Sequence, residues 1–227
     1  MTRVLDYVPR LDDRNRGHRI RASLLDGEVL AVRPRFWVPG PVLDQGREGA
    51  CVGFGCTAEA LASPVRWKPS MTWEGLSTTA ASDAAARDVY RRAKEIDEWE
   101  GVDYEGTSVR AGMLVGRERG WWTGFRWAFN MAELRAALEE GPVVIGVDWT
   151  DGMYEAPRGV LSISGDVVGG HCILVTGYSC HMRAYRLRNS WGPDWGRNGS
   201  AYINAADLNG ILFRAGGEAA VPIGRAA

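Results

Sequence analysis

The sequence has no apolar run of the roughly 18 residues that a membrane-spanning helix needs, and no apolar segment follows the positive charges near its start. We therefore expect a soluble, cytoplasmic protein without an export signal. A large excess of charge is also missing, because 27 basic residues oppose 28 acidic ones. This balance gives no reason to expect binding to nucleic acid or to a membrane.

Cysteine is scarce as well. The 4 cysteines are Cys51, Cys56, Cys172 and Cys180, which are too few for a disulfide framework at this length. They also lack the paired CxxC spacing of a structural zinc site. The sequence therefore predicts reduced thiols, no metal and no cofactor.

The composition changes along the chain and indicates one two-part domain behind a short arm. Residues 1–34 are charged and without periodicity, which predicts an N-terminal arm. Residues 35–227 form the predicted domain. Its helical lobe is expected at about 45–135 and its β lobe at about 136–215, with residues 35–44 added to the β lobe.

Helices dominate the first part of this domain and strands the second. Capping residues and apolar periodicity predict helices over residues 50–62, 82–98, 108–120 and 130–140. β-Branched and aromatic runs predict strands at "PVVIGVDW", "GVLSIS", "HCILVTGY", "AYRLRNSW" and "SAYINAAD". Strands that follow helices, instead of alternating with them, indicate an α+β fold with an antiparallel sheet. The tryptophan-rich segment 120–129 is expected to pack between the lobes.

Cys51 stands where one of these helices begins, within "LDQGREGACVGFGCTAEA". A thiol attacks as its thiolate, and the unpaired N–H groups and dipole at a helix N-terminus favour that charge. Gly49 and Ala50 leave space around the sulfur. A lone cysteine is more often a small buried apolar residue, so a catalytic interpretation needs a base elsewhere in the chain.

One of the 3 histidines is suited to be that base. His171 opens a predicted strand directly after two glycines, and Asn189 ends the next predicted strand. The amide oxygen of Asn189 can accept a hydrogen bond from the imidazole and fix its orientation. Two adjacent strands would bring these side chains together, whereas His18 and His181 are expected at the surface.

Three segments resemble those of the papain-like cysteine peptidases. "DQGREGAC" is similar to the family's nucleophile segment, including the spacing between Gln45 and Cys51, and "GGHCILVTGY" is similar to its histidine strand. "LRNSWGPDWGRNGSAYI" matches the family's asparagine block at Asn189, Ser190, Trp191, Gly192, Trp195, Gly196, Asn198 and Gly199. The resemblance covers residues 35–215 and implies a two-lobed papain-like fold with the active site in the cleft between the lobes.

The resemblance also implies roles for single residues. Cys51 would be the nucleophile, His171 would hold the thiolate and later protonate the leaving amine, and Asn189 would orient His171. Trp191 would shield the hydrogen bond between His171 and Asn189 from water. Gln45 would stabilise the oxyanion together with the backbone N–H of Cys51.

Substrate binding is implied at Gly106, Trp191 and Gly170, with Gly106 pairing with the backbone of an extended peptide. Small residues at Gly146, Gly169 and Gly170 predict a wide pocket without a readable side-chain preference.

Two positions depart from the family pattern: Glu48 stands where a cysteine is usual, and Val52 replaces the usual tryptophan. The local packing must therefore differ from that of the family. The arm is also much shorter than the inhibitory pro-segments of secreted members, so we expect that no zymogen stage is needed or that the arm docks a protein partner.

Together these features favour a thiol endopeptidase or exopeptidase that cleaves peptide or protein substrates through an acyl-enzyme. Two alternatives stay open. The fold could serve as a structural or binding module of a larger assembly such as a phage particle, or the thiol could act in an amidase or cell-wall peptidase.

Overall fold

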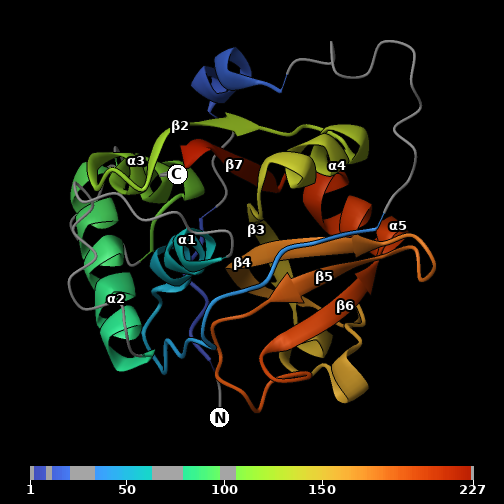
Figure 1. The fold of residues 1–227 in the computed structure, drawn as a ribbon. Coiled ribbons are helices and arrows are strands. Elements are labelled where there is room, and N and C mark those ends of the chain that lie inside the picture. Colours follow the sequence, from blue (N-terminus) through green and yellow to red (C-terminus); the bar gives the residue numbers. More distant parts are fainter. Residues whose placement is uncertain (1–2, 9–11, 21–33, 63–78, 98–105, 226–227) are drawn as a thin grey trace, which may run out of the picture.

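The computed structural model describes residues 3–8, 12–20, 34–62, 79–97 and 106–225. Three helices, α1, α2 and α3, gather on one side of the sheet, whereas α4 and α5 lie on the other side, and α1 lies between α2 and the sheet (Figure 1). The helices are α1 (Cys51–Leu61), α2 (Thr79–Ile96), α3 (Val109–Glu118), α4 (Met131–Glu140) and α5 (Ala205–Asn209). Shorter turns of helix are η1 (Asp13–His18), η3 (Asp151–Tyr154), η4 (Pro157–Gly159) and the π-helical η5 (Gly210–Arg214).

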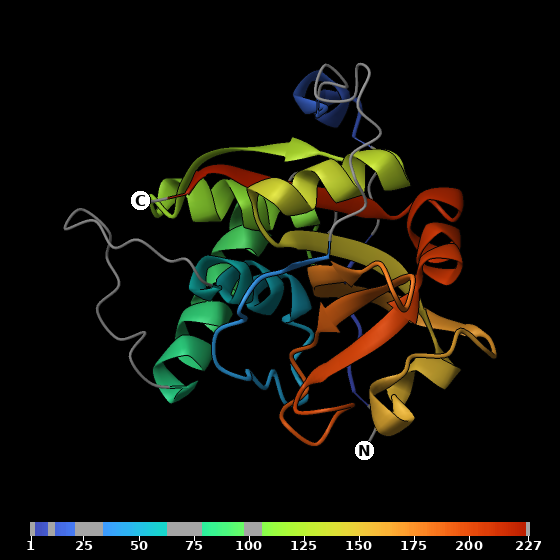
Figure 2. The same ribbon diagram turned by 45° about the vertical axis from the view of Figure 1, so that its right-hand side comes forward.

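Every strand pairing in the described sheet is antiparallel. The strands are β1 (Arg35–Phe36), β2 (Trp122–Trp127), β3 (Val143–Thr150), β4 (Val167–Ser179), β5 (Ala184–Arg188), β6 (Ser200–Asn204) and β7 (Glu218–Arg225). They form a 7-stranded sheet in the order β2-β7-β3-β4-β5-β6, with β1 paired to β4. Figure 2 shows β2 and β7 running together along one edge. The predicted α+β fold is confirmed.

Two helices begin at the capping residues that the sequence predicts. The Ser108 hydroxyl accepts the N–H of Ala111 at the start of α3, and the Asn130 side chain accepts the N–H of Glu133 at the start of α4. Each cap satisfies one backbone donor that the first helical turn leaves unpaired. The predicted helix ends lie within three residues of the observed ones.

The strand predictions need four corrections. β7 was not predicted, and it lies beyond the residues assigned to the β lobe. In the predicted strand "GVLSIS" only Val160 makes a bridge, to Tyr202, because η4 and a loop occupy this region. β2 was not predicted as a strand, since its tryptophans were assigned only to core packing. β4 begins at Val167, so His171 lies inside the strand instead of opening it.

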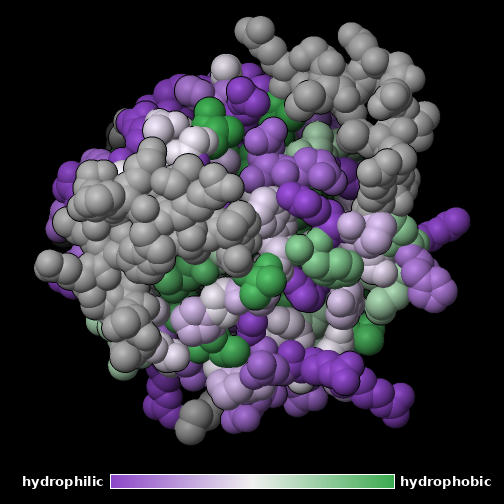
Figure 3. Space-filling view, in the orientation of Figure 1, coloured by the Kyte–Doolittle hydropathy of each residue, from purple (hydrophilic) through white to green (hydrophobic). Residues whose placement is uncertain are grey.

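The tryptophans of the segment 120–129 are buried, whereas Thr123, Arg126 and Phe129 of the same segment are exposed. Trp121, Trp122 and Trp127 are at most 3% exposed and pack with apolar residues of α1 and α3. A second apolar cluster fills the other side of the sheet. On the face shown in Figure 3, hydrophobic residues are interspersed with hydrophilic ones. Among the described residues, none of the helices has the length and apolar character required to cross a membrane.

Candidate active site

Cys51 is the first residue of α1, and no side chain caps this end of the helix. Its thiol receives hydrogen bonds from backbone N–H groups of Cys172, Asp6 and Val52, which favour the thiolate. Burial outweighs them and raises the pKa of Cys51 to about 11. The helix start therefore does not activate the thiol in this state, contrary to the sequence expectation, because the sulfur is fully covered.

His171 and Asn189 lie side by side on the sheet. Nε2 of His171 is 2.8 Å from Oδ1 of Asn189, as expected for a histidine on β4 and an asparagine directly after β5. Nδ1 of His171 is buried and has no hydrogen-bond partner among the described residues. Cys172, the residue after His171, donates its N–H to the thiol of Cys51. The structure thus brings the proposed nucleophile, base and orienting residue together.

Aromatic rings enclose this histidine. The imidazole centroid of His171 is 4.7 Å from the ring of Trp149 and 4.8 Å from that of Trp191. Both tryptophans are at most 2% exposed. Burial lowers the pKa of His171 to about 4, while the hydrogen bond with Asn189 acts in the opposite direction. Trp191 thus lies where the sequence placed it, next to the pair that it was expected to shield.

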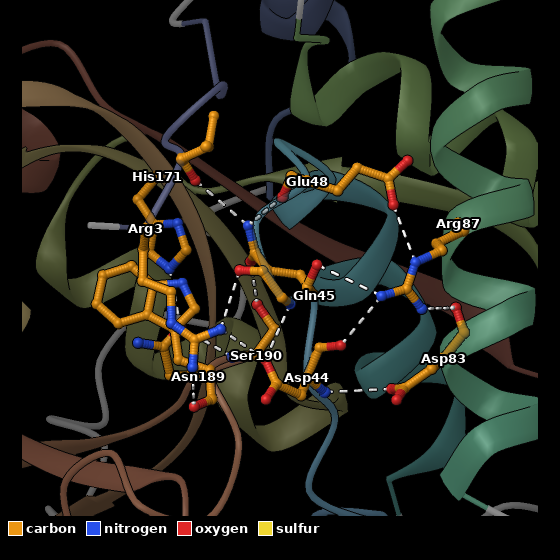
Figure 4. Close-up of polar contacts among 12 residues, drawn as sticks. Arg3, Asp44, Gln45, Glu48, Asp83, Arg87, His171, Asn189 and Ser190 are labelled. Atoms are coloured by element: carbon orange, nitrogen blue, oxygen red, sulfur yellow. Dashed lines mark hydrogen bonds and ion pairs between the residues drawn. The ribbon is translucent and has the colours of Figure 1, made fainter. Parts of the chain in front are cut away.

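Gln45 is held with its amide nitrogen toward the cleft. Its Oε1 accepts the Ser190 hydroxyl at 2.7 Å, and its Nε2 donates to the carbonyl of Glu48 at 2.9 Å. Figure 4 shows Gln45 beside Ser190 and near His171. Nε2 also points at the carbonyl of Val4, 3.4 Å away, as a donor to an oxyanion would. Ser190, a motif residue with no assigned role, thus positions Gln45.

The two unusual residues of the nucleophile segment both contact helices. The Glu48 carboxylate pairs with Arg87 of α2 at 2.9 Å, where the family usually has a cysteine. Val52 is 1% exposed and packs against Gly112 of α3, where an added Cβ would come within 2.6 Å of Val52. These contacts replace the packing that the missing cysteine and tryptophan would provide.

The site is closed by the protein's own N-terminus. Residues 3–8, hereafter the arm segment, run along the cleft, where the Asp6 N–H bonds to the Cys51 thiol and the Tyr7 N–H bonds to Gly170, the residue before His171. Cys51 and His171 are both 0% exposed, and Gln45 and Asn189 are at most 2% exposed. From the sequence we expected either no zymogen stage or a docking role for the arm, and not an arm segment in the cleft.

Backbone hydrogen bonds hold the arm segment as an extended strand. The Thr107 N–H donates to the carbonyl of Asp6 at 3.3 Å, and the Val8 N–H donates to the carbonyl of Thr107 at 3.5 Å. From the other wall of the cleft, the Gly170 carbonyl accepts the Tyr7 N–H at 3.0 Å. The cleft therefore binds a peptide backbone from both sides.

One end of the arm segment is tied down by a side chain. Arg3 donates to Asp44 Oδ1 at 2.7 Å, to the Gly46 carbonyl at 2.9 Å and to the Trp191 carbonyl at 2.9 Å. Its side chain is 24% exposed, so these charge-assisted contacts are partly shielded from water. Figure 4 shows Arg3 near Asn189 and Asp44. Arg3 thus anchors the arm next to the site.

The predicted substrate-binding residues fall in this cleft, with one shift. Gly170 pairs with Tyr7 of the arm, and a Cβ at Gly169 would lie 2.9 Å from Leu5. The backbone pairing expected at Gly106 is made instead by its neighbour Thr107. Gly146 borders the Tyr7 ring, where an added Cβ would come within 2.2 Å of the ring.

Glu218 lies at the end of the Tyr7 side chain, and the sequence did not predict a role for it. Its carboxylate accepts the Tyr7 hydroxyl at 2.9 Å. Its flanking glycines and alanines carry no motif that could have identified it.

Comparisons with known proteins agree with this geometry. Residues 118–211 match the family model described as papain family cysteine protease, a span that includes His171 and Asn189 but not Cys51. Gamete and mating-type specific protein A of Dictyostelium discoideum is 34% identical over 83 residues, or 36% of this chain. The matched part is only 18% of that relative's length.

Solved structures share the whole fold. Xylellain, a cysteine protease from Xylella fastidiosa, is 17% identical with a TM-score of 0.66, over 96% of this chain and 93% of its own. Digestive procathepsin L 3 from the Tenebrio molitor larval midgut is also 17% identical, with a TM-score of 0.52, over 91% of this chain and 74% of its own. At these identities the likeness shows the fold. The chain thus combines a papain-family match over residues 118–211 with a papain-like fold, and it is similar to the papain-like cysteine peptidases.

Proposed function

We propose that the chain is a thiol endopeptidase that its own arm keeps latent. The observation that supports this most is the His171–Asn189 pair at 2.8 Å, with a buried imidazole nitrogen left unpaired beside the Cys51 segment. A thiol, a base and an orienting group in this arrangement are the parts that nucleophilic catalysis requires.

In the proposed reaction, the Cys51 thiol gives its proton to Nδ1 of His171, and the sulfur attacks a peptide carbonyl. The negative charge that forms on the carbonyl oxygen is stabilised by Nε2 of Gln45 and the backbone N–H of Cys51. The C–N bond then breaks as the imidazolium protonates the leaving amine. Water, deprotonated by His171, hydrolyses the thioester and restores the thiol.

Asn189 acts through His171 in this scheme. Its Oδ1 accepts from Nε2, which leaves Nδ1 directed to the thiol and stabilises the imidazolium. A second hydrogen bond, from the Ser190 N–H at 2.8 Å, fixes this amide oxygen. The pair therefore keeps one ring orientation through the whole cycle.

An endopeptidase is favoured over an exopeptidase because the cleft admits a chain that continues on both sides. Arg3 binds at one end of the arm segment, and Val8 pairs with Thr107 at the other. A site that accepts only a chain terminus would block one of these two directions.

Two features explain why the arm is not itself a good substrate. The thiol of Cys51 accepts the N–H of Asp6, so an amide donor faces the sulfur instead of a carbonyl carbon. The Val4 carbonyl is 3.4 Å from Nε2 of Gln45, longer than a strong hydrogen bond. The arm segment thus fills the cleft in a geometry that does not lead to attack.

The test uses the full chain with the arm weakened. In the variant Arg3→Ala with Tyr7→Ala, hereafter the arm variant, both side-chain anchors of the arm segment are removed. We expect it to cleave an unfolded protein such as reduced casein far faster than the wild type. Adding Cys51→Ala should abolish cleavage, whereas adding Cys180→Ala, a partly exposed cysteine in a turn, should leave the rate unchanged.

Two results would overturn the proposal. Cleavage that survives Cys51→Ala would exclude the thiol mechanism. An arm variant whose Cys51 reacts readily with iodoacetamide, but which cleaves no peptide bond, would favour a structural module or an amidase.

A further inference from the structure

A second thiol lies beside the proposed nucleophile. Cys172 follows His171 on β4, and its N–H donates to the thiol of Cys51. The Cβ of Cys172 is two bonds from this nitrogen, so the Cys172 side chain is within reach of the Cys51 sulfur. Burial raises the pKa of Cys172, and the nearby Cys51 raises it further, because two thiolates at this separation would repel each other.

Gly55 leaves room for this second sulfur against α1. Gly55 is four residues after Cys51, so the two lie on the same face of the helix, with Cβ positions about 5–6 Å apart. An added Cβ at Gly55 would come within 2.9 Å of Sγ of Cys172. The Cys172 sulfur therefore lies about one helical turn from Cys51, on the face of α1 that carries the nucleophile. A disulfide joins Cβ atoms roughly 3.5–4.5 Å apart, so side-chain rotation and a small approach of α1 to β4 would connect the two sulfurs.

The other cysteine of α1 is directed elsewhere. Cys56 is five residues after Cys51, which is about 140° further around the helix. Its sulfur packs against α3, where an added Cβ at Gly112 would come within 2.7 Å of it. Cys56 is 0% exposed, like Cys51, so it is a matched control for Cys172.

The arm segment shields this pair of thiols. The Asp6 N–H donates to the Cys51 thiol, and Tyr7 belongs to the apolar cluster that contains Cys51 and Cys172. The two cysteines are at most 1% exposed. Departure of the arm segment would therefore uncover Cys51 while a second thiol stays beside it.

We propose that Cys172 is a resolving thiol, which forms a disulfide with Cys51 when a peroxide oxidises the uncovered nucleophile. This inference rests on the proposed function, in which departure of the arm exposes Cys51. The disulfide would keep the peptidase inactive until a dithiol reduces it. It would also prevent the irreversible oxidation of Cys51 to the sulfinic acid.

The reaction consumes one peroxide and two thiols. The Cys51 thiolate attacks an oxygen of hydrogen peroxide, the O–O bond breaks, and the departing hydroxide leaves as water with the proton that the thiol has released. The Cys172 sulfur then attacks the sulfenic acid at Cys51, the S–O bond breaks, and a second water leaves with the Cys172 proton. The two thiols are thereby oxidised by two electrons in total, and the peroxide is reduced to two waters. Dithiothreitol returns these electrons by thiol–disulfide exchange and is itself oxidised to a disulfide.

A first test locates the disulfide by mass. The arm variant is treated with a small excess of hydrogen peroxide, its remaining thiols are blocked with iodoacetamide, and the protein is digested without reduction. We expect two peptides joined through Cys51 and Cys172, formed at least about tenfold more slowly in the wild type, whose arm covers the thiols. Adding Cys56→Ala to the arm variant should leave this cross-link in place.

A second test asks whether Cys172 protects Cys51. In the arm variant with Cys172→Ala or Cys172→Ser, peroxide should convert Cys51 to a sulfenic acid that dimedone traps, and then to the sulfinic acid. After dithiothreitol, iodoacetamide labelling of Cys51 should be at least about tenfold lower than in the matched variant with Cys56→Ala. Urea unfolding of each variant before oxidation reports whether it is folded, and the cross-link in the first test needs no substitution of Cys172.

The cross-link and the peptidase activity fail separately. Absence of the cross-link between Cys51 and Cys172, a cross-link from Cys51 to Cys56 in its place, or equal recovery of Cys51 with and without Cys172 would overturn the resolving role. An arm variant that forms the cross-link but cleaves no casein would support this role and contradict the peptidase proposal. One that cleaves casein without forming the cross-link would contradict the resolving role alone.

Discussion

At the scale of single residues, burial and one hydrogen bond have opposite effects on the pKa of His171. Burial disfavours the imidazolium and lowers the pKa of His171 to about 4, whereas the contact with Asn189 raises it. Catalysis by an ion pair needs the imidazolium, so the hydrogen bond must be retained when the arm leaves and the burial is relieved.

We predict that Asn189→Ala, made in the arm variant, lowers kcat/KM by about 10- to 100-fold, because a hydrogen bond to a charged group contributes about 1.5–3 kcal/mol. The sign of the pH effect follows from the same contact. Asn189 raises the pKa of His171, so its loss should move the alkaline limb of the kcat/KM profile to lower pH.

The matched control for this prediction is Asn209→Ala, at the last residue of α5. Asn209→Ala should leave both kcat/KM and its pH profile unchanged. A uniform loss of rate with an unshifted alkaline limb would indicate a structural defect instead of a change at His171.

The sequence predicted the proximity of residues that belong to recognisable segments, and it gave no indication of an isolated one. Cys51, His171 and Asn189 stand in blocks whose order and spacing carry information, and the structure brings them together. Glu218 stands alone at the start of β7, and its role depends on a tyrosine 211 positions away in the sequence. No local pattern can encode such a contact.

At the scale of elements, the position of Cys51 depends on how closely α1 packs against α2. A Cβ at Gly53 of α1 would lie 2.2 Å from the backbone carbonyl oxygen of Ala86 and 2.8 Å from Tyr90, both on α2. Glycine normally weakens a helix, and this close approach is the reason why it is required here. The packing of α1 against α2 thus fixes the helix that presents Cys51.

We predict that Gly53→Ala lowers the free energy of unfolding, measured with urea, by about 1–3 kcal/mol despite the better helix propensity of alanine. Gly210→Ala is the matched control, because Gly210 has helical backbone angles and open space around its Cα. There the change should be neutral or stabilising by up to about 1 kcal/mol. If Gly53→Ala and Gly210→Ala changed the free energy of unfolding equally, the close contact between Gly53 and Ala86 would not be what requires glycine.

Helices with their own caps and most strands with a β-branched pattern were predictable, whereas β2 and β7 were not. α3 and α4 begin at the caps read from the sequence. β2 carries tryptophans on a strand whose only described ladder is with β7, nearly 100 residues later in the chain. "GVLSIS" has the composition of a strand, but only Val160 finds a bridging partner.

At the scale of the whole molecule, the arm joins parts of the fold that are distant in sequence. Arg3 binds Asp44 beside the nucleophile segment, and Asn15 binds Glu218 on β7. Further along, Arg19 pairs with Glu133 of α4 at 2.6 Å. The sequence shows only interleaved charges in this region, which look like a solvated segment, because each partner is more than 40 positions away.

The coverage of Cys51 by the arm segment predicts how the reactivity of this thiol depends on pH. Burial raises the thiol pKa to about 11 in the closed chain, so alkylation of the wild type should be slow near neutral pH and still rising at about pH 9. Release of the arm removes most of that burial but leaves the N–H groups of Cys172 and Val52 in place. The thiol pKa should then fall, and the rate in the arm variant should be nearly constant from about pH 6 to 8.

The measurement is the rate of iodoacetamide labelling at Cys51 across this pH range, in the wild type and in the arm variant. A fall of two pKa units or more corresponds to at least about a 100-fold difference near neutral pH. Met182→Ala, at an exposed turn away from the arm contacts, should follow the wild-type profile. If the arm variant still gained tenfold per pH unit up to about pH 9, the thiol would be held neutral by the folded domain itself, and closure by the arm would not be the cause of latency.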